Sequence, residues 1–145
     1  MSRPGELTAA ELTDVEGGQL LDVVAAWWVL AGDELEQEFG FRPEVVSTGL
    51  YRTRAVQVAI NEKYGQNVSP DDTDHCKGRA ADIRNWQAYH DVDRTKFTTI
   101  LANHGFYNQQ IDGRPFPSEP WHYRNLRENF PKTNDEEQRR RSWQL

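Results

Sequence analysis

The chain has 145 residues, of which 37% are hydrophobic and 28% are charged, and its formal net charge is −6. This length corresponds to one domain that is large enough to build a hydrophobic core without disulfide or metal staples. The low pI, near 5.2, argues against a general nucleic-acid binder with a basic face, and the single cysteine, Cys76, excludes an intrachain disulfide and a cysteine-rich zinc module.

The charge is unevenly distributed along the chain. Residues 1–44 contain ten acidic and two basic residues, a net charge of −8, whereas residues 45–145 contain thirteen acidic and fifteen basic residues, a net charge of +2. No apolar run approaches the ~20 residues that a membrane span needs. The chain also opens without the basic and then apolar stretch of a secretory signal peptide. We therefore expect no stable membrane insertion.

Residues 1–43 are predicted to form an acidic helical front. Thr8 and Glu11 fit a capping box, which predicts a short helix from residue 9 to the following pair of glycines. A second, amphipathic helix is indicated by apolar residues at intervals of three and four. These residues are Leu20, Val23, Val24, Trp27 and Trp28. A further helix is expected from Asp33 to Gly40, because glycine is typical of a helix end.

Residues 44–131 are predicted to form the catalytic core, in which strands and helices alternate. Four short strands are expected, at residues 44–51, 80–84, 106–111 and 121–123. Two helices are expected, one from Thr53 to Gly65 and one from Asp93 to Gly105, with a polar loop at 66–79. Residues 132–145 are expected to form a charged, flexible tail. The pattern predicts a single α+β domain over residues 1–131, with a small antiparallel sheet flanked by helices.

Two short segments contain the residues that point to chemistry. The first has the pattern H-x-x-G-x-A-x-D, with His75 in the predicted loop and Asp82 in the strand that follows. These two side chains can converge if the chain turns at Gly78, which has no Cβ to hinder a turn. The second segment has the pattern E-x-x-H, from Glu119 to His122. The proline after Glu119 predicts a bend that turns both side chains to one side.

Two histidines and an aspartate form a ligand set that suits zinc. His75, Asp82 and His122 would supply two nitrogens and one oxygen and leave a fourth position for water, as in catalytic zinc sites. Such a water needs a base, and Glu119 is the candidate; the alternative is that Glu119 only hydrogen-bonds a histidine. Arg52, at the junction of a predicted strand and helix, is the candidate to stabilise an oxyanion.

Other notable side chains have structural interpretations. His90 and His104 are interpreted as structural histidines, the latter at a helix end. Cys76 is a soft alternative ligand, but it is interpreted as a non-ligand because the neighbour of a ligand usually points away. Trp121 either stacks on a substrate or packs against the core.

These motifs, in this order, resemble the zinc D-alanyl-D-alanine carboxypeptidase family. The family includes vancomycin-resistance dipeptidases and carboxypeptidases and phage L-alanyl-D-glutamate endolysins, and the amino-terminal domain of hedgehog proteins shares its fold. The resemblance covers residues 44–124 and implies a hedgehog/DD-peptidase-like fold. It implies that His75, Asp82 and His122 hold one zinc ion per chain, that Glu119 is the general base, and that Arg52 steadies the substrate carbonyl.

The resemblance also implies residues that bind substrate. Gln57 falls at the glutamine of the family motif, and Thr73 lies two residues before the first ligand, where serine is usual. Trp121 is the third candidate for a substrate contact. The usual Ser-Gly-Tyr-Arg segment is one residue longer here, from Thr48 to Arg52, so Arg54 is the rival of Arg52.

The leading hypothesis is a zinc-dependent peptidase that hydrolyses peptidoglycan stem peptides. It would cut either as a D-Ala-D-Ala carboxypeptidase or as an L-Ala-D-Glu endopeptidase, acting as a monomer and without a nucleic-acid partner. The missing leader predicts a phage or prophage enzyme that stays in the host cytoplasm until release to the cell wall, or one associated with the virion. The alternative hypothesis is a catalytically silent, zinc-containing binding or virion structural module of the same fold.

Overall fold

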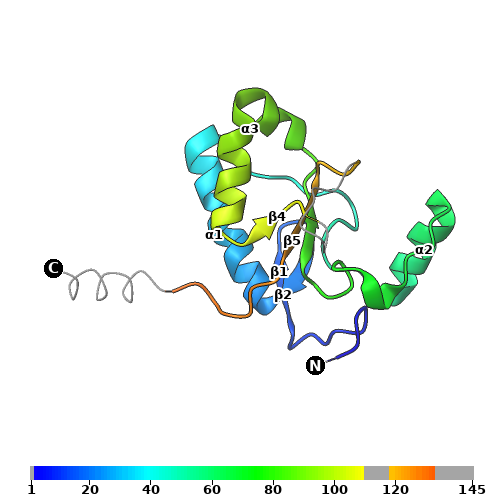
Figure 1. Cartoon of the computed structure of the whole chain (residues 1–145). Coiled ribbons are helices and arrows are strands. Elements are labelled where there is room, and N and C mark those ends of the chain that lie inside the picture. The colour runs from blue at the N-terminus through cyan, green and yellow to red at the C-terminus, as the bar shows by residue number, and fades with distance from the viewer. Residues whose placement is uncertain (1, 110–117, 133–145) are drawn as a thin grey trace.

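The computed structural model describes residues 2–109 and 118–132, and it has an α+β architecture (Figure 1). The strands are β1 (Leu12–Val15), β2 (Gly18–Leu21), β3 (Ala80–Asp82), β4 (Phe106–Tyr107) and β5 (His122–Asn125). The helices are α1 (Asp22–Phe39), α2 (Arg54–Tyr64) and α3 (Trp86–Asn103), and a single 3₁₀ turn lies at Pro70–Asp72. None of the helices in the described part of the chain is long and apolar enough to cross a membrane. The predicted fold class is confirmed.

The central sheet has three antiparallel strands in the order β3-β5-β4. Helices α1 and α3 lie side by side against this sheet, whereas α2 stands apart on its other side (Figure 1). Fully buried side chains of the two packed helices, such as Leu35 and Phe97, form the core with residues of the strands. The ring of Phe97 meets Tyr123 of β5 edge to face, with ring centroids 5.8 Å apart, which fixes α3 on the central strand.

The helix predicted at residues 9–18 is wrong, because this segment forms the β1–β2 hairpin. One of the two capping-box bonds is present, because Thr8 N donates to Glu11 Oε1 at 3.0 Å. Glu11 N donates to the backbone oxygen of Thr8 at 3.0 Å, and Thr8 Oγ1 donates to Glu11 Oε1 at 3.1 Å. They close an isolated turn instead of a helix, because the chain then reverses at Gly17, where φ is +92°. The reversal places Leu20 and Leu21 of β2 in the core.

The two helices predicted after residue 18 are one continuous helix, α1. It begins at Asp22, so Leu20 belongs to the preceding strand. Asp33 does not start a second helix, because it lies inside α1, where its carboxylate accepts a hydrogen bond from Arg42 at 2.9 Å. The predicted end is confirmed: Gly40 adopts a left-handed conformation with φ of +87° and donates its N–H to Glu36 O.

The strand predicted at residues 44–51 is also wrong. Only Val45 pairs, in an isolated bridge with Ile83. The chain then turns at Thr48, whose φ of +60° is rare for a β-branched residue. This turn ends the pairing and redirects Leu50 into the core, where it is 1% exposed.

The remaining predicted elements are present with shifted bounds. Helix α2 begins after Thr53, whose Oγ1 accepts from Val56 N at 3.2 Å, and it ends at Gly65. Helix α3 begins earlier than predicted, but Asp93 still caps its second half: the backbone there is non-helical, and Oδ1 accepts from Lys96 N at 3.0 Å. The expected strands at 80–84, 106–111 and 121–123 correspond to β3, β4 and β5. Residues 110 and 111 of the second, and the tail from 133, lie outside the described residues.

Candidate metal centre

Strand pairing brings two of the three candidate ligands together. Asp82 of β3 lies opposite His122 of β5 in the antiparallel register, and His122 Nδ1 is 2.9 Å from Asp82 Oδ1. His75 reaches the same oxygen from the preceding loop, with its Nε2 at 3.2 Å. That loop turns at Gly78, where φ is +71°. The three side chains are buried, and their ligand atoms all lie within 4.8 Å of one another.

The ring of His75 is held in one tautomer. Its Nδ1 donates a hydrogen bond to the backbone oxygen of Leu50 at 2.9 Å. The proton of the neutral ring is therefore on Nδ1, and the lone pair of Nε2 faces Asp82 and His122. A carbonyl partner of this kind orients histidine ligands in metal sites.

The geometry fits a zinc ion. Bonds of about 2.0–2.2 Å in a tetrahedral site place ligand atoms about 3.3–3.5 Å apart. The two distances to Asp82 Oδ1, 3.2 Å from His75 and 2.9 Å from His122, need only a small outward movement to reach this spacing. Two imidazole nitrogens and a carboxylate oxygen are also a donor set that zinc accepts, with one position left open.

The carboxyl group of Asp82 is held ionised, as a metal ligand must be. Burial raises its pKa, but the neighbouring rings of His122 and His75 lower it by more, so the pKa of Asp82 lies well below its usual range. The second oxygen, Oδ2, accepts from Arg52 Nη2 at 3.3 Å. Arg52 therefore contacts Oδ2, while the two histidines contact Oδ1.

Arg52, and not its rival Arg54, faces the centre. Besides Asp82, the guanidinium of Arg52 donates from Nε to Thr48 O at 2.8 Å and from Nη1 to Gln57 Oε1 at 3.1 Å. Its side chain is 13% exposed, and burial lowers its pKa, although an arginine stays charged at neutral pH. Arg54 instead pairs with Asp71 at 2.7 Å, away from the histidines.

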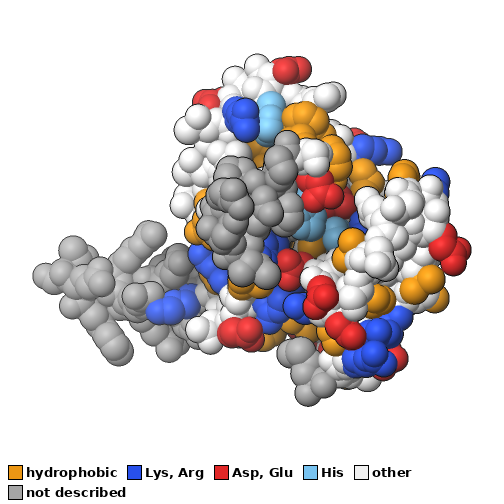
Figure 2. Space-filling model, turned by 45° about the vertical axis from the view of Figure 1, so that its right-hand side comes forward, with side chains coloured by type: hydrophobic (Ala, Val, Ile, Leu, Met, Phe, Trp, Pro, Cys, Tyr) orange, Lys and Arg blue, Asp and Glu red, His pale blue; other side chains and the backbone are white. Residues whose placement is uncertain are grey.

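A cavity of about 230 Å³ lies beside the three candidate ligands. Its walls include Glu119 and Arg52 and two of the predicted substrate-binding residues, Gln57 and Thr73. Figure 2 shows histidine side chains recessed in a hollow of the surface, with acidic and basic side chains around them. The structure thus brings together every candidate site residue except Trp121.

Trp121 lines a second, adjoining cavity of about 840 Å³. Arg52, Asp82 and Glu119 line both cavities, so the two adjoin at these side chains, and together they are called the cleft. The outer wall of the second cavity comes from α2. It consists of the side chains Val56, Ala59, Ile60, Lys63 and Tyr64. The cleft is thus polar at the histidines and largely apolar along α2.

The sequence did not predict two side chains that position the segments bearing the candidate ligands. Asp74 forms an ion pair with Arg124 of β5, with Oδ2 and Nε 3.0 Å apart, which ties the His75 loop to the central strand. Asn108, just after β4, donates to two backbone carbonyls of the E-x-x-H segment. Neither contact has a local spacing signal, because each joins residues brought together only by the sheet.

The remaining histidines and the cysteine lie outside the cluster. His90 packs between Trp86 and Phe97, with ring centroids 5.0 and 5.5 Å away. His104 binds the carbonyl of Ile100 through Nδ1 at 2.8 Å, at the end of α3. Cys76 is fully buried and is not among the metal-ligand group found in the described residues.

This architecture, with its histidine–aspartate–histidine cluster on the sheet, has the fold of peptidoglycan carboxypeptidases. The structure of LdcB, an LD-carboxypeptidase studied for its peptidoglycan recognition, matches with a TM-score of 0.62 at 19% identity, over 85% of this chain and 71% of that one. The vancomycin-resistance D,D-pentapeptidase VanY, as a variant in complex with Zn(II), matches with a TM-score of 0.55 at 22% identity, over 86% and 83% of the two chains.

A third match is VanYB in complex with D-alanine-D-alanine, with a TM-score of 0.53 at 21% identity, over 86% of this chain and 81% of that one. No family model and no curated protein matches the sequence. The DD-peptidase-like fold implied by the sequence motifs is confirmed by these structures.

Proposed function

We propose that this protein is a zinc-dependent peptidase that hydrolyses peptidoglycan stem peptides. The observation that carries the proposal is the buried cluster of His75, Asp82 and His122, which borders a cavity shared with Glu119 and Arg52. The solved structures of the same fold support it, because VanY binds Zn(II), VanYB binds D-alanine-D-alanine, and LdcB recognises peptidoglycan.

Five residues of the cavity have a defined part in the proposed hydrolysis. A zinc ion held by the two histidines and Asp82 would supply a Lewis acid for the scissile carbonyl and lower the pKa of a bound water. Glu119 accepts the proton of the attacking water and passes it to the leaving amine. Arg52 directs a fixed positive charge into the cleft and stabilises the negative charge that develops on the carbonyl oxygen.

The substitution Glu119→Gln tests the proposed base. It keeps the size of the side chain and leaves the backbone carbonyl, which accepts from His122 N at 3.1 Å, in place. We expect kcat on a stem pentapeptide to fall by about 10²–10⁴-fold, with the zinc content unchanged. The control is Glu62→Gln, a change of an exposed glutamate on α2. Full activity of the Glu119 variant would exclude the mechanism.

Metal removal tests the site itself. Dialysis against a chelator should abolish hydrolysis, and one equivalent of Zn²⁺ per chain should restore it. Mass spectrometry of digested muropeptides distinguishes release of terminal D-alanine from cleavage after L-alanine. A protein that binds zinc but cleaves no wall peptide would support the alternative of a silent zinc-containing module.

The biological setting belongs to the proposal as well. The resemblance to phage endolysins supports an enzyme that acts as a monomer on the host wall after release from the cytoplasm, or from the virion. Lysis of cells by the purified protein added from outside, compared with lysis by the Glu119→Gln variant, tests this part.

A further inference from the structure

Asn108 connects the two functional ends of the E-x-x-H segment. Its Nδ2 donates to the backbone oxygen of Glu119 and to that of His122, each at 2.7 Å. A side-chain amide has two N–H donors on one nitrogen, so a single group can satisfy both carbonyls. These bonds join the residue after β4 directly to the proposed base and to the third candidate ligand.

The backbone at Glu119 depends on this contact. Regular pairing of β5 begins only at His122, so Glu119 lies outside the strand ladder. Among the described residues, the carbonyl of Glu119 accepts from His122 N at 3.1 Å and from Asn108. The first bond closes the turn on itself, and the bond from Asn108 anchors the turn to the sheet.

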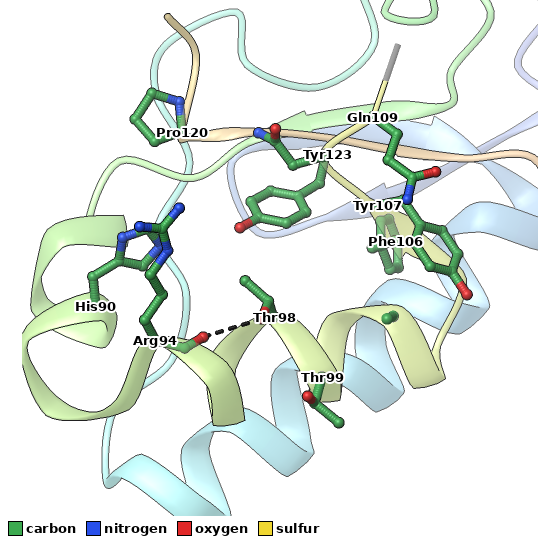
Figure 3. A pocket seen from close by; sticks show the side chains of 11 residues that line it. His90, Arg94, Thr98, Thr99, Phe106, Tyr107, Gln109, Pro120 and Tyr123 are labelled. Carbon is green, nitrogen blue, oxygen red and sulfur yellow. Dashed lines mark hydrogen bonds between the residues drawn. The ribbon is translucent and has the colours of Figure 1, made fainter. Parts of the chain in front are cut away.

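The turn borders a cavity on its other side. Pro120, which follows Glu119, lines a separate cavity of about 480 Å³ between α3 and the strands, and Asn108 lines it too. Figure 3 shows Pro120 and Tyr123 across this space from Thr98 and Thr99 of α3. The amide of Asn108 therefore restrains the turn at this side, in addition to the bond that Ile83 N donates to Trp121 O at 2.9 Å.

We propose that Asn108 is a positioning residue that fixes the general base relative to the third zinc ligand. The inference rests on the proposed function. It follows that activity depends on the number of donors at position 108. Aspartate has the same shape but would bring a carboxylate oxygen against two carbonyls, and serine offers one donor.

The test is a graded series at position 108, with kcat, KM and zinc affinity measured for each variant. For Asn108→Asp we expect kcat to fall by about 10²-fold, as for a misplaced catalytic group, and zinc affinity in competition with a chelator to fall by about tenfold. KM should change by less than about threefold, because the substitution removes no substrate contact. Asn108→Ser should give intermediate values.

The neighbouring change Gln109→Ala is the matched control. Gln109 is exposed and lines the same cavity, so its variant should keep the wild-type kcat and zinc affinity. Wild-type kcat and zinc affinity in Asn108→Asp would overturn the proposal, as would a loss of thermal stability with zinc affinity unchanged. If Asn108→Asp fails to fold, the kcat, zinc affinity and thermal stability of Asn108→Ser test the proposal by the same criteria. A wild-type chain without hydrolytic activity would refute the proposed function, while zinc affinity would still report on Asn108.

Discussion

Replacing Gln57 by leucine should reduce activity through Arg52 and not through a lost substrate contact. Gln57 is only 2% exposed although it borders the cleft. Its Oε1 accepts from Arg52 Nη1 at 3.1 Å, and its Nε2 donates to Asn61 Oδ1 at 3.0 Å. Both ends of the amide are therefore used within the protein, and the glutamine braces the guanidinium beside Asp82.

The expected losses of stability and of kcat follow from these contacts. A hydrogen bond to a charged group contributes about 1.5–3 kcal/mol to stability. Leucine has a similar volume, so the substitution leaves no large cavity, and water can replace the bond to the half-buried Asn61. We therefore expect the free energy of unfolding to fall by about 1.5–3 kcal/mol. A displaced guanidinium should lower kcat by about 10-fold to 100-fold.

A double-mutant cycle with Arg52→Met distinguishes an effect of Gln57 through Arg52 from a direct contact of Gln57 with substrate. If Gln57 acts through Arg52, Gln57→Leu should have almost no further effect on kcat or on urea unfolding once Arg52 is absent, giving a coupling energy of about 0.5–3 kcal/mol. If Gln57 contacts substrate, KM should rise in both backgrounds with kcat unchanged. Additive effects of the two substitutions would refute the reasoning.

Two further predictions concern the surroundings of the centre. Gly78→Ala should destabilise the fold by about 1–3 kcal/mol and weaken zinc binding, because φ is +71° and a Cβ would lie 2.8 Å from Leu21 N. Urea unfolding and chelator competition measure both effects, and unchanged values would contradict the role of this turn. Neutralising three acidic residues of α1 to glutamine should leave turnover of a short soluble peptide within about twofold, since neither they nor their partners Arg42, Lys96 and His104 line the cleft. The three acidic residues are Glu34, Glu36 and Glu38. A large loss of turnover would show that the acidic front belongs to the active site.

The candidate ligands could be predicted because zinc chemistry restricts residue types as well as spacing. His75 and Asp82 lie seven residues apart around a glycine, and such a pair can converge through local geometry alone. His122 was predicted from the E-x-x-H motif, although the strand pairing that brings it to Asp82 leaves no local pattern. The bonds of Asn108 and the ion pair of Asp74 also depend on the sheet, but no motif marks either residue, so they escaped prediction.

The failed element predictions have a common cause. Thr8 N donates to the Glu11 carboxylate as in a capping box, but an isolated turn makes this bond as well as a helix does, so the pattern could not exclude the hairpin that follows. The Val- and Tyr-rich segment at 44–51 favours a strand by composition. Tertiary packing overrides that preference, because the left-handed backbone of Thr48 carries Leu50 into the core.

Because α2 contributes little to the core, its residues can affect the selectivity of the cleft with little effect on the stability of the fold. Gln57 is its only buried side chain, so apolar residues on its surface, such as Val56, Ile60 and Tyr64, can be exchanged at little cost to folding. Yet the same helix supplies the outer wall of the cleft through Val56, Ile60 and Tyr64. Sequence divergence along α2 can therefore change which molecules the cleft admits while the centre on β3 and β5 stays intact. A library of variants at these three positions would test this, because none of the three side chains belongs to the buried core.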